Sequence, residues 1–539
     1  MAVISLNKKS LEKKVGKITP KLKERIDMLG CAIENETAEE LMVDISPNRP
    51  DLLSEQGVAR ALLAFIGKKT GLLKYKAEKS KYKLIVEDSV KSVRPYTACA
   101  VIKNMKFDSE KIKEIIEMQE KLHMTYGRNR KRIAIGIYPM EKIKFPITYK
   151  ALAPDKLKFK PLESESEITG TQILSRHHAG KNYGHLLEGK SKFPVFEDAK
   201  GKILSMPPII NSEETGRVTE KTKELFIECS GFDMEVLNRC LSIITTALAD
   251  MGGKIYSITM KYGSKTAVTP DLSPDKMKVN LKAVNKLLGL ELKDKELKQY
   301  LERMNYSYSS GTVLIPAYRT DVLHEVDLIE DVAIAYGYEN FKQEIPHVST
   351  IGKETKMEIL KRNIAESLVG MNMLETYSYS ITNQEDECTK MNTKEDLIQL
   401  TNAKTNYNVM RNKMLPSLMK IFGNNRDVDY PQRIFEIGRV FEKNKGISEK
   451  TNLAIALTNS NFTEMRQVLD YLSRMFDVKI SIQELKQDSF IEGRTAKVLA
   501  RGQPIGVIGE IHPQVLSNWK LLVPVSAMEL ELDKIKDLI

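Results

Sequence analysis

The stretch that decides the fold is Ile315-Pro-Ala-Tyr-Arg-Thr-Asp-Val-Leu-His-Glu-Val-Asp-Leu-Ile-Glu-Asp-Val-Ala-Ile-Ala-Tyr-Gly-Tyr338. Its second half has the apolar spacing of an amphipathic helix, which we expect near residues 323–337. The stripe expected to be buried consists of Val326, Ile329, Ala333 and Tyr336.

The same stretch is acidic, with five carboxylates in eleven residues and no lysine or arginine among them. Asp327, Glu330 and Asp331 stand at i, i+3 and i+4, where like charges on a helix repel each other. A bound cation reverses the sign of this interaction, and a set of hard oxygen ligands favours Mg²⁺. The spacing alone leaves a second interpretation open, an acidic solvated face with Asp321 as the helix N-cap.

The residues before this stretch predict a small module. Leu297, Leu301 and Met304 have helical spacing, a turn follows at Ser309–Gly311, and Val313–Ile315 has the character of a short strand. Helices and a strand in this order within about 70 residues favour a winged-helix-like module.

Breaks in the pattern divide the chain. Pro270 and Pro274 interrupt it on one side of the module, and the segment 344–352 interrupts it on the other. The region before Pro270 reads as mixed α/β, with a helix at 110–123 and a strand at 133–138. At 539 residues, three to four domains are expected. The predicted domains, multidomain α/β and α+β in class, are 1–85, 86–266, 268–345 and 350–539.

Composition excludes several classes of protein. Hydrophobic residues make up 42% and charged residues 29%, and no apolar run reaches the roughly 18 residues of a membrane span. The N-terminus lacks the apolar region of a secretion signal, so we expect a cytoplasmic protein with no membrane partner. The formal charge of +11 favours a polyanionic partner or, equally, a lysine-rich solvated surface. Five dispersed cysteines are expected to be reduced thiols: Cys31, Cys99, Cys229, Cys240 and Cys388.

Three short motifs have ordinary alternatives. Residues 184–191 match the P-loop string, but the flanks lack the strand and helix that a phosphate loop requires. His177 and His178 have no third ligand at metal spacing, which favours ordinary histidines. The basic run Arg128–Arg132 fits either phosphate contact or a solvated turn.

The quoted stretch closely resembles the B5 module of the phenylalanyl-tRNA synthetase β-subunit family, in its archaeal/eukaryotic form. Further stretches resemble the family in the same order along nearly the whole chain. They are 48–51, 128–138, 206–211, 226–229, 411–416, 435–439 and 508–513.

The resemblance implies an (αβ)₂ heterotetramer that joins L-phenylalanine to tRNA(Phe) with ATP and Mg²⁺. Catalysis is then expected on the α subunit, with no aminoacylation or cofactor-binding residue in this chain. Residues 350–539 are expected to form a degenerate class II synthetase domain, an antiparallel sheet with helices. Residues 435–439 are placed like a motif 2 remnant, and the segment 506–510 lacks the arginine pattern that holds ATP.

The resemblance also implies two sites. Four carboxylates match a Mg²⁺ site shared with the α subunit: Asp321, Asp327, Glu330 and Asp331. The 86–266 region matches the B3/B4 domain, which hydrolyses tyrosine mischarged on the tRNA. There Glu228 is expected to recognise the tyrosine hydroxyl and Asn211 to bind the ester or a water, with His185 as a further candidate. The ordinary alternative is a turn residue at Asn211 and a strand-edge charge at Glu228.

Two other functions remain open on the sequence. One is a free-standing aminoacyl-tRNA hydrolase that uses only the B3/B4-like region, and the other is a non-enzymatic RNA-binding scaffold. A partner chain with intact class II motifs separates both from a synthetase subunit.

Overall fold

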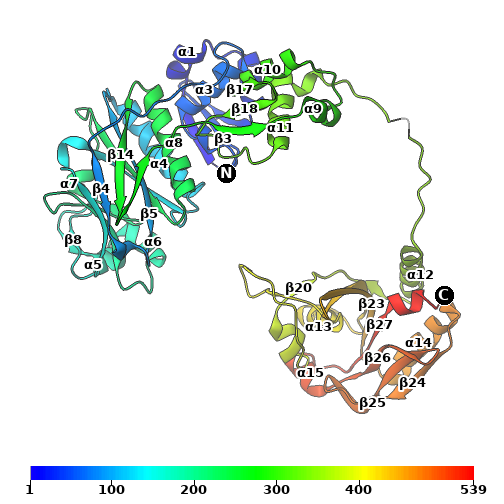
Figure 1. Cartoon of the computed structure of the whole chain (residues 1–539). Helices are drawn as coiled ribbons and strands as arrows, with labels where there is room; N and C mark the ends of the chain where they lie inside the picture. The colour runs from blue at the N-terminus through cyan, green and yellow to red at the C-terminus, as the bar shows by residue number, and fades with distance from the viewer. Residues whose placement is uncertain (1, 347, 539) are drawn as a thin grey trace. The chain divides into compact units, whose positions relative to one another are not determined.

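The computed structural model describes residues 2–346 and 348–538, which fold into two compact units, Met1–Glu344 and Ile345–Ile539 (Figure 1). Each unit has its own hydrophobic cores, so each is stabilised by its own buried apolar side chains. Among the described residues, no helix combines the length and the apolar character that crossing a membrane requires.

The first part of unit 1 is a three-stranded antiparallel sheet in the order β1-β3-β2, together with three helices. Buried and half-buried residues alternate along β1 and β3, so one face of this sheet packs on the helices. Asn7, Thr19 and Ser54 cap the three helices through their side chains. The elements are β1 (Ala2–Asn7), α1 (Lys8–Val15), α2 (Pro20–Met28), β2 (Cys31–Glu36), β3 (Glu40–Ile45), η1 (Pro50–Leu52) and α3 (Glu55–Phe65).

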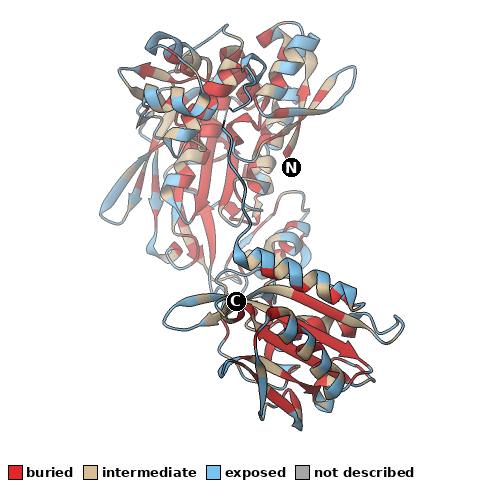
Figure 2. Cartoon of the chain, turned by 90° about the vertical axis from the view of Figure 1, so that its right-hand side faces the viewer, coloured by how far each residue is buried: buried red, intermediate tan, exposed pale blue. Residues whose placement is uncertain are grey.

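The second part contains a ten-stranded sheet in the order β12-β11-β10-β7-β4-β14-β5-β13-β6, with β15 paired to β14. The neighbouring strands β5, β13 and β6 consist almost entirely of buried residues, and Figure 2 colours the strands of this sheet largely red. In β5, Ala98 and Ala100 belong to the core that contains α4 and α8, whereas Cys99 and Val101 belong to the core of the other face. The elements are β4 (Lys83–Val86), η2 (Asp88–Val90), β5 (Tyr96–Lys103), α4 (Ser109–Met124), β6 (Ile133–Pro139), η3 (Met140–Lys142), β7 (Ile147–Leu152), β8 (Lys158–Phe159), β9 (Ile168–Thr169), α5 (Gly170–Arg176), α6 (His178–Tyr183), η4 (Gly184–Leu186), β10 (Phe193–Glu197), β11 (Ile203–Met206), β12 (Ile210–Asn211), α7 (Glu213–Gly216), β13 (Leu225–Gly231), α8 (Met234–Asp250), β14 (Lys254–Tyr262) and β15 (Lys265–Thr269).

The third part of unit 1 is the small module predicted around residues 297–338. The expected helices and the strand are present, with an additional strand on each side of β18 in a sheet of order β16-β18-β17. The elements are β16 (Asp275–Lys278), α9 (Leu281–Leu288), α10 (Asp294–Arg303), β17 (Ser307–Ser309), β18 (Thr312–Ile315), α11 (Glu325–Tyr336) and η5 (Tyr338–Asn340).

Two details of α11 differ from the sequence expectation. The N-cap is His324, whose Nδ1 accepts the amide of Val326 at 3.2 Å, and not Asp321. Val326 is 49% exposed, and Leu328 is buried in its place, because α11 turns a different face towards the module. The predicted stripe is therefore wrong at Val326 and correct at Ile329 and Ala333.

Buried polar contacts join the three parts of unit 1. Arg60 of α3 forms an ion pair with Asp250 at the end of α8, with 2.9 Å between nitrogen and oxygen. Its guanidinium also lies 3.8 Å from the centre of the Tyr318 ring, just after β18. One side chain thus contacts both other parts of the unit.

Unit 2 is built on a seven-stranded sheet in the order β19-β22-β23-β27-β26-β25-β24, antiparallel except for the β19–β22 pair. Alternate residues of β23 serve two cores, with Leu453 and Ile455 on one face and Ala454 and Ala456 on the other. The elements are α12 (Lys356–Gly370), β19 (Leu374–Glu375), β20 (Ile381–Thr382), the π-helical turn η6 (Glu385–Thr389), β21 (Val409–Met410), α13 (Leu415–Asn424), β22 (Arg433–Lys443), β23 (Ile447–Thr458), α14 (Phe462–Phe476), β24 (Ile480–Glu484), β25 (Phe490–Ala500), β26 (Gln503–Ile511), α15 (Pro513–Asn518), β27 (Val525–Glu531) and α16 (Leu532–Lys536).

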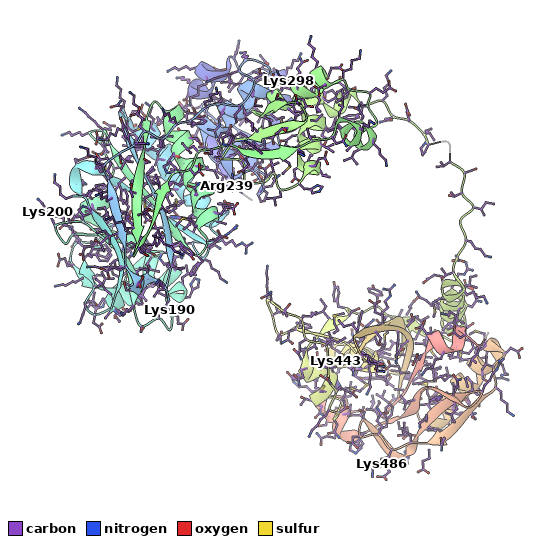
Figure 3. All side chains as sticks on the ribbon, viewed as in Figure 1. Lys190, Lys200, Arg239, Lys298, Lys443 and Lys486 are labelled. Atoms are coloured by element: carbon purple, nitrogen blue, oxygen red, sulfur yellow. The ribbon has the colours of Figure 1, made fainter. Side chains whose placement is uncertain are left out.

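Basic side chains are distributed over both units. Figure 3 labels Lys190, Lys200 and Lys298 on separate elements of unit 1, and Lys443 and Lys486 on unit 2. Several basic side chains are in surface ion pairs, such as Lys443 with Asp396 and Lys486 with Glu492. Such exposed pairs contribute little to stability. Basic side chains therefore occur on both units, but the excess of Lys and Arg over Asp and Glu lies almost entirely in residues 1–344.

Candidate functional site

A cavity of about 480 Å³ lies in unit 1 between α4, the strands β6 and β13, and the segment 207–218. Its walls are mostly apolar side chains, with a small number of polar groups among them. Such a concave, largely apolar pocket with a few convergent polar groups is typical of a small-molecule site. Both predicted editing residues, Asn211 and Glu228, line it.

Glu228 is the most unusual of these polar groups. It lies in β13, which is flanked by β5 and β6, and it is 1% exposed. The alternative of a strand-edge charge is therefore wrong. Burial raises the pKa of this carboxyl to about 8, so Glu228 is mostly neutral at pH 7. Its Oε2 forms no hydrogen bond with any described residue, which leaves one oxygen for a ligand.

Tyr138 of β6 joins the two predicted residues. Its hydroxyl lies 3.2 Å from Glu228 Oε1 and 3.4 Å from Asn211 Oδ1, and the phenol is fully buried. Gly136, directly opposite Glu228, supplies the space for this contact. A Cβ at Gly136 would lie 2.5 Å from Glu228 Oε1 and would also overlap the Tyr138 hydroxyl.

A charged cluster forms a second wall of the cavity. Arg130 donates to both oxygens of Glu120 at 2.9 and 3.1 Å. His123 Nε2 accepts the amide of Ile135 at 2.8 Å, so its Nδ1 carries the proton and donates to Glu120. Burial raises the pKa of Glu120, but His123 and Arg130 outweigh it and lower this pKa to about 2. Glu120 is therefore an anion that holds Arg130 at the cavity.

Sequence reasoning did not single out Tyr138, Gly136 or the Glu120–His123 pair. Arg130 was included only as part of the basic run, and it proves to be held by Glu120 and by the Ile209 carbonyl at 2.9 Å. Arg128, Asn129 and Arg130 all have positive φ, which marks a tight left-handed turn. The positions of these residues along the sequence do not indicate that they meet at one cavity.

The other sequence motifs lie elsewhere. His185 is in η4 and is not one of the described residues that line the cavity. The P-loop-like string follows a helix, α6, and precedes a strand, β10, the reverse of what a phosphate loop needs. His177 caps α6 and its Nε2 lies 3.1 Å from the carbonyl of Leu162.

Three of the four predicted metal-site carboxylates have protein partners. Arg319 donates to both oxygens of Asp321, at 2.8 and 2.7 Å, and to Asp331 at 2.7 Å. Asp331, 5% exposed, also accepts the hydroxyl of Tyr306. Asp327 Oδ2 accepts the amides of Leu323 and His324 at the start of α11, both at 2.7 Å.

These carboxylates do not fit a resident Mg²⁺ within the chain by itself. Arg319 already supplies the positive charge for Asp321 and Asp331, whereas Glu330 is exposed. Throughout residues 2–346 and 348–538, no three metal-ligating side chains are gathered in a way that could hold an ion.

In unit 2, the strand predicted to resemble motif 2 is β22. Its Glu436 is fully buried and pairs with Arg411 at 2.8 Å, and Arg411 also donates to the carbonyl of Arg439 at 2.8 Å. Arg439 itself is on the surface, where it pairs with Glu449. The buried charges of this strand are therefore engaged within the domain.

Comparison with protein families gives two matches. A family model described as "Phenylalanyl tRNA synthetase beta chain CLM domain" matches residues 342–532. Another, described as "tRNA synthetase B5 domain", matches residues 277–338, the module around α11.

Curated relatives match along most of the chain. The phenylalanine–tRNA ligase beta subunit of Pyrococcus abyssi is 42% identical over 496 residues, which cover 90% of this chain and 89% of that protein. The beta subunit of Archaeoglobus fulgidus is 39% identical over 548 residues, which cover 100% and 99%.

A solved structure agrees with these relatives. It is an N-terminal fragment of the phenylalanyl-tRNA synthetase beta subunit from Pyrococcus horikoshii, with a TM-score of 0.60 and 39% sequence identity. The match covers 62% of this chain and all of the fragment. The resemblance noted in the sequence is confirmed: the chain belongs to the phenylalanyl-tRNA synthetase β-subunit family.

Proposed function

We propose that the chain acts as the β subunit of a phenylalanine–tRNA ligase, which with an α subunit joins L-phenylalanine to tRNA(Phe) at the expense of ATP. The observation that carries this proposal is the 42% identity to a curated β subunit over 90% of the chain. The aminoacylation site belongs to the α subunit in this proposal, in an (αβ)₂ assembly located in the cytoplasm. The engaged Glu436–Arg411 pair supports a silent synthetase-like domain here.

Co-purification tests this assignment. A tagged version of this chain, co-expressed with a candidate α subunit, is expected to retain that subunit on the affinity column. The purified complex should charge tRNA(Phe) with phenylalanine. A chain that never retains an α subunit and still hydrolyses aminoacyl-tRNA would instead support a free-standing hydrolase.

The cavity around Glu228 supports a second activity, hydrolysis of tyrosine esterified to tRNA(Phe). A hydrophobic pocket that selects phenylalanine rejects an isostere with one extra hydroxyl by only about 10²-fold, so a hydrolytic second site improves accuracy. In the cavity, Glu228 Oε2 would contact the phenol hydroxyl of tyrosine. Phenylalanine lacks this hydroxyl and would leave the buried oxygen unpartnered, which disfavours its binding.

The hydrolysis needs water and no further reactant. Water oxygen attacks the ester carbonyl, the bond between that carbon and the ribose oxygen breaks, and a proton passes from the water to the ribose oxygen. Asn211, whose side chain lines the cavity, would orient the ester or the attacking water. Glu228 would recognise the tyrosine hydroxyl and take no part in bond breaking, while Tyr138 holds the other oxygen of Glu228 in place.

Glu228→Ala in the assembled enzyme tests this assignment. Hydrolysis of Tyr-tRNA(Phe) made separately should fall about tenfold or more, equivalent to about 1.4 kcal/mol of barrier. Charging with phenylalanine should persist, and Glu165→Ala, at an exposed glutamate in the same part of unit 1, provides the control. Unchanged hydrolysis by Glu228→Ala would remove Glu228 from the site and direct the search to Asn211 and His185.

The carboxylates near α11 belong to the proposal as a Mg²⁺ site that only the α subunit completes. Two features support it: Glu330 is exposed, and both hydrogen bonds to Asp327 fall on Oδ2 and none on Oδ1.

Asp327→Lys should weaken the αβ complex or its charging activity. Glu330→Gln, which disturbs no described ion pair, should weaken Mg²⁺-dependent association. A Glu330→Gln, Asp327→Asn variant with a normal Mg²⁺ response would exclude the site.

A further inference from the structure

A second cavity, of about 500 Å³, lies in unit 2 against the large sheet. Its lining comes from η6, from the start of α13 and from strands β22, β23 and β25–β27. Apolar side chains such as Leu415 and Phe490 form part of the wall. The cavity is of the size that holds a small molecule.

Several polar atoms that line this cavity have no hydrogen-bond partner among the described residues, and every one of them is an acceptor. They are Glu387 Oε1, Glu387 Oε2, Asn412 Oδ1 and Asn452 Oδ1. The hydrogen bonds of the side-chain nitrogens fix the orientation of both amides, because Asn412 Nδ2 donates to Glu395 at 3.2 Å and Asn452 Nδ2 donates to Glu529 at 2.7 Å. The atom without a partner in each amide is therefore the oxygen.

Glu387 is the centre of this set, because it is 2% exposed and both of its oxygens are unpartnered. Burial and the nearby Glu529 raise its pKa to about 8. The backbone amides of Asn412 and Lys413, which lie near the carboxyl without a hydrogen bond of good geometry, and the charge of Arg411 lower this pKa to a smaller extent. Buried polar groups without partners are rare in folded proteins, so such a concentration of them in one cavity indicates a missing ligand or water.

Apart from Glu387, most charged side chains that line this cavity are engaged within the domain; the exception is Lys497 of β25, which forms no ion pair with any described residue. Glu529 accepts the amides of Met414 and Leu415 at the start of α13. Lys413 pairs with Glu395 at 2.5 Å, and Lys534 pairs with Glu531 at 2.9 Å. The fully buried atoms of the lining that have no partner among the described residues are therefore acceptors.

We propose that this cavity binds a small organic molecule with a primary ammonium group and an apolar body. An ammonium group offers three N–H donors and no acceptor, which matches the carboxyl of Glu387 and the amide oxygens of Asn412 and Asn452. The apolar part of the molecule would pack on Leu415 and Phe490. A resident metal ion has less support, because no group of three metal-ligating side chains occurs among the described residues.

Isothermal titration calorimetry on the full-length chain tests the proposal with phenethylamine as the probe. Phenethylamine should bind, and 2-phenylethanol, which replaces the ammonium group with a hydroxyl, should bind at least about tenfold more weakly. Glu387→Gln should weaken phenethylamine binding by a similar factor. Glu366→Gln removes an exposed carboxyl of α12 that does not line the cavity, so this variant should bind the probe as the unaltered chain does.

Proton release provides a second readout that does not depend on a variant. The ammonium group favours the ionised form of Glu387, so binding at pH 7 releases the proton of this carboxyl. Binding enthalpies measured in buffers of different ionisation enthalpy should therefore show the release of about one proton per ligand bound. Equal affinity for the amine and the alcohol would overturn the proposal. Loss of binding in Glu228→Gln alone would also overturn it, because it would place the probe in the cavity of unit 1.

Discussion

Glu228 shows what one buried residue can contribute to recognition. Burial in a central strand keeps its carboxyl mostly protonated at neutral pH, and only one of its oxygens has a partner, Tyr138. A neutral carboxyl can both donate and accept, which suits a phenol hydroxyl better than a charged group would. In the proposed editing site, desolvation of this carboxyl would provide the selectivity.

The raised pKa of Glu228 also makes stability depend on pH. The folded chain holds this proton up to about pH 8, whereas the unfolded chain releases it near 4.5, so the contribution is full below pH 4.5 and is lost as pH rises towards 8. Between pH 5.5 and 7.5, the unaltered chain should lose roughly 1 kcal/mol per pH unit relative to Glu228→Gln. Urea unfolding of unit 1 at both pH values measures this, and parallel pH profiles would contradict it.

Gly136 offers a second test at the same scale. Gly136→Ala places a methyl group 2.5 Å from Glu228 Oε1 and against the Tyr138 hydroxyl, so the two side chains must move apart. Hydrolysis of Tyr-tRNA(Phe) should fall about tenfold or more. Charging with phenylalanine, measured on the same preparation, should remain unchanged. Full hydrolytic activity in this variant would show that the geometry around Glu228 does not matter.

Helix α11 illustrates which features of an element a local pattern can predict. The helix and two of its buried residues, Ile329 and Ala333, follow from apolar spacing. Of the two interpretations of the acidic residues in this helix, the solvated face is wrong at Asp331, because the structure buries it. The reason is Arg319, which lies outside the helix and whose partners cannot be inferred from helical periodicity.

Arg319 should therefore be essential to the small module. Arg319→Met removes the positive charge that Asp321 and Asp331 share, and leaves Asp331 buried without its ion pair. Loss of one partner of a buried pair destabilises a protein by about 3–5 kcal/mol. Denaturant unfolding should show this loss, and adding Asp331→Asn should recover part of it. No recovery in the double variant would mean that Arg319 acts through Tyr306 or Asp321 instead.

On the scale of the whole chain, the break predicted near residue 345 coincides with the boundary between the compact units. Short apolar patterns, such as that of Leu297, Leu301 and Met304, were sufficient to predict helices and strands. The convergence of Tyr138, Asn211 and Glu228 was not predictable in this way. β6 pairs with β13, but β12 is at the other end of the sheet order, and Asn211 meets Tyr138 only in the folded structure. The cavity at Glu387 left no sequence signal, since its residues are spread over 387–534.

The central claim is that this chain serves a synthetase without itself activating the amino acid. ATP–pyrophosphate exchange with phenylalanine measures activation directly, with the purified chain alone and after addition of an α subunit. We expect no exchange by the chain alone and robust exchange by the complex. Exchange by the chain alone would contradict it.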